Sequence, residues 1–122
     1  RGFDLWLMST SDEWSAQAFA RLYGVDPARV VAFSARVAQG KLTEDILAPV
    51  PYGPGQAAAI VMLIGRSPAL ILGGMGNADL LEYGTGLRVL SAESPDGAPP
   101  AELKEGWLFQ PAFKPVKTPQ TP

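Results

Sequence analysis

Cysteine and histidine are both absent from this chain of 122 residues. Their absence excludes disulfides, a thiol nucleophile, a zinc site of the Cys/His type and a histidine general base. A Ser-His-Asp triad is excluded for the same reason. Any chemistry must therefore use carboxylates, hydroxyls, Lys or Arg side chains, or backbone amides. The absence of cysteine does not fix the compartment, because a chain without thiols is compatible with an oxidising or a reducing one.

The chain also lacks a strong excess of charge of either sign, since its formal net charge is −2. We therefore expect no nucleic-acid partner and no attraction to an anionic membrane. The longest apolar runs are shorter than a membrane span, and no signal-like segment opens the chain, so a soluble domain is expected. The hydrophobic content of 47% is enough for one domain with one core.

Strand-like and helix-like patterns alternate along the chain, interrupted by one hairpin. Helical spacing of apolar residues, turn residues and short apolar runs predict these elements. This order predicts an α/β fold with a Rossmann-like, mainly parallel sheet, flanking helices and a small β-hairpin. The apolar helix at 55–65 is expected to be buried against a sheet, and the apolar strand at 69–72 to be covered on both faces. The predicted elements are a strand at 3–8, a helix at 12–23, hairpin strands at 29–37 and 41–47, a helix at 55–65, a strand at 69–72, a helix at 77–83 and a strand at 87–90.

Composition shifts after Ser91, where proline and loop-forming residues become frequent. We expect residues 1–92 to form the α/β core and residues 93–122 to form a Pro-rich C-terminal tail. The aromatic residues near Trp107 predict that part of this tail docks onto the core. The last residues, 115–122, carry three prolines and are expected to be disordered.

Three stretches at strand ends or helix starts are candidates for binding an anion. In Ser9-Thr10-Ser11, hydroxyls at a helix start can hold a phosphate oxygen; the alternative is a capping box that joins Thr10 to Glu13. In Gly53-Pro54-Gly55-Gln56, glycines let a phosphate approach the backbone; the alternative is a proline-rich connector, because the Walker ending is missing.

The third stretch is Gly73-Gly74-Met75-Gly76-Asn77-Ala78-Asp79, which follows an apolar strand. Its glycine spacing does not fit the dinucleotide fingerprint Gly-x-Gly-x-x-Gly. It is either an anion-binding turn or a tight turn in which Asp79 faces the positive end of its own helix.

Taken together and in this order, the three stretches resemble the haloacid dehalogenase-like superfamily, in particular its phosphoserine phosphatase-like branch. Leu7 to Ser11 is similar to the second motif, whose first hydroxyl binds the transferring phosphoryl group. Gly40 to Thr43 and the approach to Gly53–Ala57 are similar to the segment that leads to the third motif. The resemblance covers residues 2–90. It implies phosphate binding by Ser9, Thr10 and Gln56, and a Mg²⁺ cofactor with Asp79 as a ligand.

The chain departs from this family at each catalytic position. The family nucleophile lies in an Asp-x-Asp-x-Thr motif, which is absent here and would precede Arg1. Gln56 stands where the third motif carries a Lys. In the fourth motif, Gly-Asp-x-x-x-Asp, Met75 (or Gly74 in a shifted alignment) replaces the first magnesium-binding acid. Only Asp79 remains of that motif.

These replacements remove the cationic groups on which phosphoryl transfer depends. One well-placed stabilising donor contributes roughly 3–4 kcal/mol to lowering the barrier. The resemblance therefore implies the C-terminal part of a phosphatase domain that is inactive as this chain. An active hydrolase would need an upstream Asp and a replacement cation near Gln56, for which Lys41 is a candidate. The alternative is a non-catalytic binding or scaffold module that uses the old phosphate crevice or the aromatic tail.

The resemblance also implies a gap in the sheet. In the family, the nucleophile strand lies between the strands that correspond to residues 3–8 and 69–72. Without it, both strands have unpaired edges, which is costly for buried backbone. We expect that the two strands pair directly, or that a protein partner or a missing N-terminal segment supplies the central strand.

Overall fold

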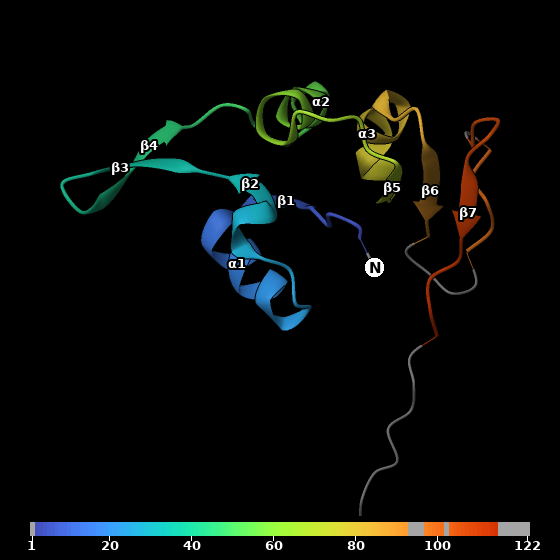
Figure 1. The fold of residues 1–122 in the computed structure, drawn as a ribbon, viewed down its shortest axis with the longest axis horizontal. Coiled ribbons are helices and arrows are strands. Elements are labelled where there is room, and N and C mark those ends of the chain that lie inside the picture. The colour runs from blue at the N-terminus through green and yellow to red at the C-terminus, as the bar shows by residue number, and fades with distance from the viewer. Residues whose placement is uncertain (1, 93–96, 102, 115–122) are drawn as a thin grey trace, which may run out of the picture. The chain divides into compact units, whose positions relative to one another are not determined.

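The computed structural model describes residues 2–92, 97–101 and 103–114, which belong to two compact units divided between Arg66 and Ser67 (Figure 1). Both units combine helices with parallel strands, and the first also holds a small antiparallel hairpin. The predicted α/β fold class is therefore confirmed. The predicted division of the chain near residue 92 falls inside the second unit and stays a prediction.

The first unit begins with a strand–helix–strand motif. Its strand β1 (Leu7–Asp12) pairs in parallel with β2 (Val30–Phe33), and helix α1 (Glu13–Leu22) and a 3₁₀ turn at Pro27–Arg29 connect them. Small side chains from α1 and the following segments form the buried part of this motif: Ala16, Ala20, Val25 and Val31.

The start of α1 differs from the predicted capping box. The strand expected at residues 3–8 lies at Leu7–Asp12 instead, so Thr10 is part of β1 and caps no helix. Asp12 is the N-cap residue, and its carboxylate accepts the backbone N–H of Ser15 at 2.9 Å. Asp is among the best N-cap residues, and it occupies the position immediately before the helix.

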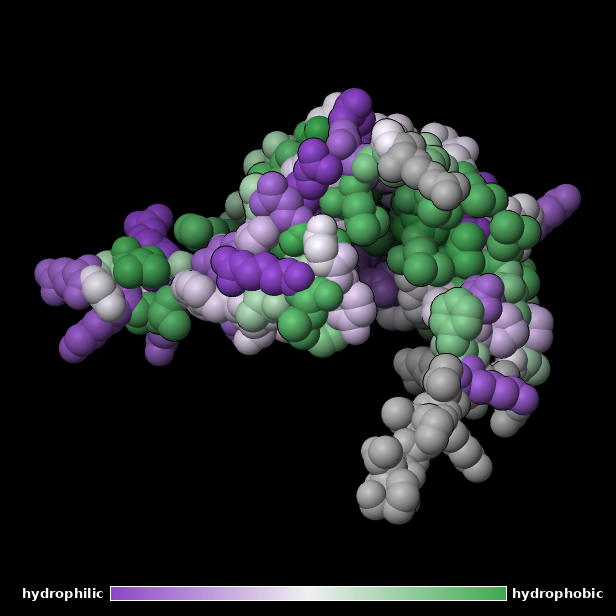
Figure 2. Space-filling model, turned by 60° about the horizontal axis from the view of Figure 1, so that its bottom comes forward, coloured by the Kyte–Doolittle hydropathy of each residue, from purple (hydrophilic) through white to green (hydrophobic). Residues whose placement is uncertain are grey.

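The predicted hairpin is confirmed as β3 (Ala35–Ala38) and β4 (Lys41–Ile46), an antiparallel pair. Gln39 and Gly40 both have positive φ angles, 52° and 73°, as a two-residue hairpin turn requires. The single strand expected at 29–37 is in fact two strands, β2 and β3, because the chain changes sheets at Ser34. Figure 2 shows the hairpin at the left, with hydrophobic surface between hydrophilic side chains.

The predicted helix at 55–65 is helix α2 (Pro54–Ala59), which continues as a π-helical turn at Ile60–Ile64. Gly65 ends it in the left-handed conformation, with its N–H donated to the carbonyl of Ile60 at 2.8 Å. The sequence predicts a helix that is apolar on most sides and buried against a sheet, but its burial in the structure is partial. Only one side is covered, and Val61, Met62 and Leu63 are exposed.

The second unit is a three-stranded parallel sheet with the order β5-β6-β7. Its strands are β5 (Leu70–Gly73), β6 (Leu87–Ser91) and β7 (Leu108–Gln110), and a 3₁₀ turn at Met75–Asn77 leads into helix α3 (Ala78–Tyr83). The sequence patterns do not predict β7. Trp107, just before it, is buried within this unit.

Within the described part of the second unit, one face of this sheet is covered and the other is exposed. A Cβ built on Gly84, at the end of α3, would lie 2.5 Å from Ile71 Cδ1 and 3.4 Å from Arg88 Cγ, so α3 covers the face that carries Ile71 and Arg88. The register pairs Leu70 with Leu87, Leu72 with Val89, and Val89 with Leu108. These five residues share the opposite face, which we call the leucine face.

The four leucines of this face are 49–64% exposed. Parallel sheets are normally covered on both faces, so the expectation that β5 is covered on both faces is wrong. The strands predicted to flank a missing central strand, now β1 and β5, belong to separate sheets, and each has one strand partner among the described residues. They do not pair with each other. The disorder predicted for 115–122 lies outside the described residues.

Candidate functional site

Ser9 and Thr10 lie in the middle of β1, where its parallel pairing with β2 is irregular. Ser9 is half-buried and Thr10 is exposed. The Ser9 hydroxyl oxygen accepts the backbone N–H of Ser11 at 3.1 Å and lies 2.9 Å from the Ser11 hydroxyl. The hydroxyls therefore form a local turn of their own, and Thr10 presents its side chain to solvent beside them.

Asp12 places a negative charge where α1 would otherwise attract an anion. The hydrogen bond from the backbone N–H of Ser15, followed by that from its side chain, lowers the pKa of the Asp12 carboxyl below its usual value. The group is thus ionised at neutral pH. A carboxylate at this helix start satisfies a free N–H group and repels a phosphate. Sequence reasoning assigned the cap to Thr10 and missed this residue.

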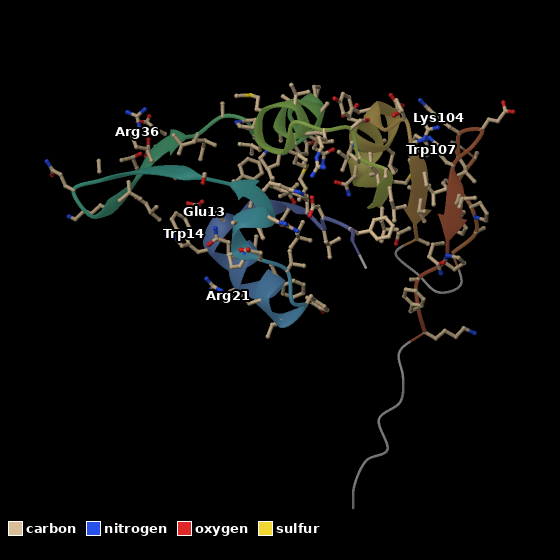
Figure 3. The ribbon with its side chains drawn as sticks, in the orientation of Figure 1. Glu13, Trp14, Arg21, Arg36, Lys104 and Trp107 are labelled. Carbon is tan, nitrogen blue, oxygen red and sulfur yellow. The ribbon has the colours of Figure 1, made fainter. Side chains whose placement is uncertain are left out.

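Glu13 also differs from its expected role. Instead of reaching back to cap the helix, its Oε2 atom accepts the hydroxyl of Ser34 at 2.5 Å. This bond joins the first turn of α1 to the residue after β2 (Figure 3). Charge-assisted hydrogen bonds of this length are the stronger kind, so Glu13 holds the strand–helix–strand motif together rather than serving a ligand.

Gln56 lies in the first turn of α2 and is only 2% exposed. Its helix start is crowded: a Cβ built on Gly55 would lie 1.9 Å from the carbonyl oxygen of Val50. Glycine is therefore required at 55 because the preceding connector passes directly over the helix start. The same crowding restricts access of a phosphate to Gln56, and the position fits the connector reading of this stretch.

Asp79 is exposed in the first turn of α3. Met75 begins the 3₁₀ turn before it, and no side chain caps α3. Among the described residues, no group of three Asp or Glu side chains is placed to hold a metal ion. One carboxylate and a thioether form a poor set of ligands for Mg²⁺, which prefers several oxygen ligands. The residues present here do not fit a magnesium centre.

The candidate residues are divided between the two units. Ser9, Thr10 and Gln56 belong to the first unit and Asp79 to the second. Each is therefore a local feature of its own strand or helix. In the described part of the chain, no helix is long and apolar enough to cross a membrane.

Two further clusters went unnoticed in the sequence. Asp4 forms ion pairs with Arg29 at 3.1 Å and with Arg66 at 2.6 Å. Lys104 pairs with Glu82 of α3, and its ammonium group lies 5.8 Å from the centre of the Trp107 ring (Figure 3). All these charged groups are largely exposed, so each pair adds little stability. No sequence pattern reveals them because the partners are far apart in the chain.

No protein-family model matches this chain, and no curated protein sequence matches it significantly. The likeness to the haloacid dehalogenase-like superfamily therefore depends on the motifs and their order alone.

Proposed function

We propose that this chain is the C-terminal part of a haloacid dehalogenase-like phosphatase domain and is catalytically inactive on its own. The observation that carries this proposal is the β1–α1–β2 motif. Ser9 and Thr10 lie in the irregular second half of β1, after the pairing of Met8 with Val31, and α1 follows this strand. Open α/β sheets bind their ligands beyond the carboxyl ends of such strands. The hairpin, the glycine-bounded helix α2 and the β5–α3–β6 motif then follow in the order that the resemblance requires.

The inactivity follows from the chemistry of the replaced residues. Gln56 supplies no positive charge and is buried, and Met75 supplies a thioether where a magnesium-binding acid is expected. Asp12 adds negative charge beside the hydroxyls of the second motif. Phosphoryl transfer requires cationic stabilisation, so what remains is weak phosphate binding near Ser9 and Thr10.

The exposed leucine face supports the proposal that the second sheet pairs with a further strand from outside the described residues. Among the described residues, one edge of β5 has no strand partner and the leucines beside it are exposed. One more parallel strand and its helix would pair this edge and cover these leucines. We propose that a protein partner or an N-terminal segment of the natural protein supplies this strand. Co-purification with such a segment should protect the amides of Leu70–Gly73 from hydrogen exchange; unchanged exchange would contradict this part of the proposal.

The phosphate proposal is tested by titrating inorganic phosphate into ¹⁵N-labelled protein and following backbone amides by NMR. We expect concentration-dependent shifts at Ser9–Asp12, with sulfate at equal ionic strength as the comparison anion. Asp12→Asn should strengthen binding severalfold because it removes a repelling charge and keeps the helix cap. Ser9→Ala should weaken it. If the amide chemical shifts of Ser9–Asp12 stay unchanged in both the unmodified protein and Asp12→Asn, phosphate binding is overturned.

The second candidate function is a non-catalytic binding module. The exposed leucine face favours it, whereas the aromatic tail gives less support than the sequence suggested, because Trp107 is buried within its own unit. The two candidates differ in one measurable respect. A binding module retains partner binding when Ser9 and Thr10 are both replaced by Ala, whereas a phosphate site does not survive that change.

A further inference from the structure

Two arginines of the first unit converge on one carboxylate. The Nη1 atom of Arg29 lies 3.1 Å from Oδ1 of Asp4, and Nη2 of Arg66 donates to Oδ2 of the same carboxylate at 2.6 Å. Arg29 ends the 3₁₀ turn before β2, and Arg66 directly follows Gly65, the residue that ends the helix at 54–64. The carboxylate therefore bridges two segments that are distant in the sequence, and we call Arg29 and Arg66 the arginine pair.

Each member of the arginine pair is engaged through a single nitrogen atom. Among the described residues, the contacts with Asp4 are the only side-chain hydrogen bonds or ion pairs of either arginine, although a guanidinium carries five N–H donors. The side chains of Arg29 and Arg66 are 42% and 74% exposed. Two positive charges thus share one negative charge, and further donors are open to a ligand from solvent.

Asp4 is held loosely at the arginine pair. Residues 2–6, which include it, form no helix or strand, and the neighbouring Phe3 and Leu5 are 79% and 62% exposed. Exposed ion pairs add little stability, and segments with few buried contacts open at a low cost in free energy. The carboxylate of Asp4 can therefore leave the arginine pair while the strand–helix–strand motif stays folded.

The arginine pair is a different site from the hydroxyls on β1. Arg29 directly precedes Val30, which pairs with Leu7, the first residue of β1. The amino ends of both strands therefore meet beside Arg29, whereas Ser9 lies further along β1. The two sites share no residue, so one can bind an anion without the other.

We propose that Arg29 and Arg66 bind a phosphate group, either inorganic phosphate or a phosphomonoester, and that the Asp4 carboxylate occupies their site when this ligand is absent. A phosphate dianion matches the two guanidinium charges and offers at least three acceptor oxygens, whereas a carboxylate ligand has the same single charge as Asp4. Asp4 competes as an internal anion, so the apparent affinity falls with the fraction of molecules in which it fills the site. The proposal goes beyond phosphate binding at Ser9 and is independent of it.

Titration of inorganic phosphate into ¹⁵N-labelled protein tests the site through the Nε–H signals of the two arginines. We expect these signals to shift, and Asp4→Asn to tighten phosphate binding by about fivefold, because the internal competitor is lost. The matched control is Asp45→Asn, which removes the same charge from an exposed position on β4 and should change the affinity by roughly twofold or less. Equal gains for the two variants, or arginine signals that stay in place in Asp4→Asn, would overturn the proposal.

A second variant tests the arginine pair itself. In the Asp4→Asn background, Arg66→Gln should weaken phosphate binding by roughly fivefold or more, because one of the two charged donors is lost. The amide signals of Ser9–Asp12 are followed in the same titration, and any shifts there should stay the same, which separates the two sites. Unchanged affinity at Arg29 after Arg66→Gln would contradict the proposal.

Phenyl phosphate distinguishes the two sources of the phosphate group. Tighter binding of phenyl phosphate than of inorganic phosphate by Asp4→Asn assigns the site to phosphomonoesters, and tighter binding of inorganic phosphate assigns it to the free ion. Acetate is the comparison anion with a single charge, and we expect it to leave the arginine signals in place. Acetate that shifts them at the same concentrations as phosphate would contradict selection of a phosphate group.

Discussion

Both units contain the same motif, a strand–helix–strand with parallel strands, but different kinds of residue stabilise it. In the first unit, α1 packs through alanines and valines, and a side chain caps it. In the second unit, α3 packs through Leu80 and Leu81 against Ile71 and Leu90, and glycines and a 3₁₀ turn precede it without a side-chain cap. The first unit therefore depends more on polar bonds at its turns, and the second on large apolar contacts and close backbone approach.

The largest loss of stability is expected from truncating a side chain in the core of the second unit. Leu81 is fully buried, so Leu81→Ala should destabilise the β5–α3–β6 motif by about 2–5 kcal/mol, through lost burial and the cavity left behind. The matched control is Leu72→Ala on the leucine face, which should change little. Chemical denaturation followed by Trp107 fluorescence measures both. Similar losses for the two variants would show that the leucine face is covered.

Close backbone approach in the second unit predicts a somewhat smaller effect. A Cβ on Gly86 would lie 2.3 Å from the carbonyl oxygen of Ala69, which is backbone and cannot yield easily. Gly86→Ala should therefore cost about 1–3 kcal/mol. Gly76→Ala is the control, since nothing lies within 4 Å of its Cβ position. Thermal unfolding compares the two, and an unchanged midpoint for Gly86→Ala would refute the close approach.

In the first unit, the polar bond between Glu13 and Ser34 can be removed alone. Ser34→Ala should cost about 1 kcal/mol, because a hydrogen bond to a charged group is lost while the partner carboxylate can still reach water. Thr10→Ala, which removes an exposed hydroxyl from β1, is a control with little expected change. Hydrogen exchange of α1 and β2 amides measures the difference. Equal protection of the α1 and β2 amides in both variants would show that the hydrogen bond between Glu13 and Ser34 does not stabilise this motif.

The smallest expected effect concerns the cap of α1 and its dependence on pH. Because the pKa of Asp12 is lowered in the folded state from its ordinary value of 3.8, its contribution is present above that value and is lost as pH falls through the lower folded pKa. Asp12→Ala should lower the thermal midpoint slightly at pH 7 but not at strongly acidic pH. Asp12→Asn keeps a cap that does not titrate, so its stability should not carry this acid-dependent loss.

Local features were readable from the sequence wherever neighbouring residues alone decide the conformation. The turn at Gln39-Gly40 is one case, since only a few residue types tolerate positive φ angles in succession. Gly65 as a helix end is another. The start of α1 was misread because Thr10 and Asp12 are both good caps, and the pairing of β1 with β2 extends the strand through Thr10 to Asp12.

The candidate site was readable only as a set of residue types. Ser9 and Thr10 lie within β1, which α1 follows, and their phosphate-binding role stays a prediction. The burial of Gln56 could not be predicted from the sequence, nor could the close passage of the connector at Val50 over the neighbouring Gly55.

The sequence by itself determined the α/β class, the hairpin and the absence of thiol and imidazole groups, because these follow from hydrophobic periodicity, turn chemistry and residue identity. Only the tertiary structure decided which faces are covered, that β7 joins the second sheet, and that Leu70 and Leu72 face outward. Burial and strand pairing depend on which distant segments meet, and an apolar residue has the same pattern in the sequence whether or not a partner covers it.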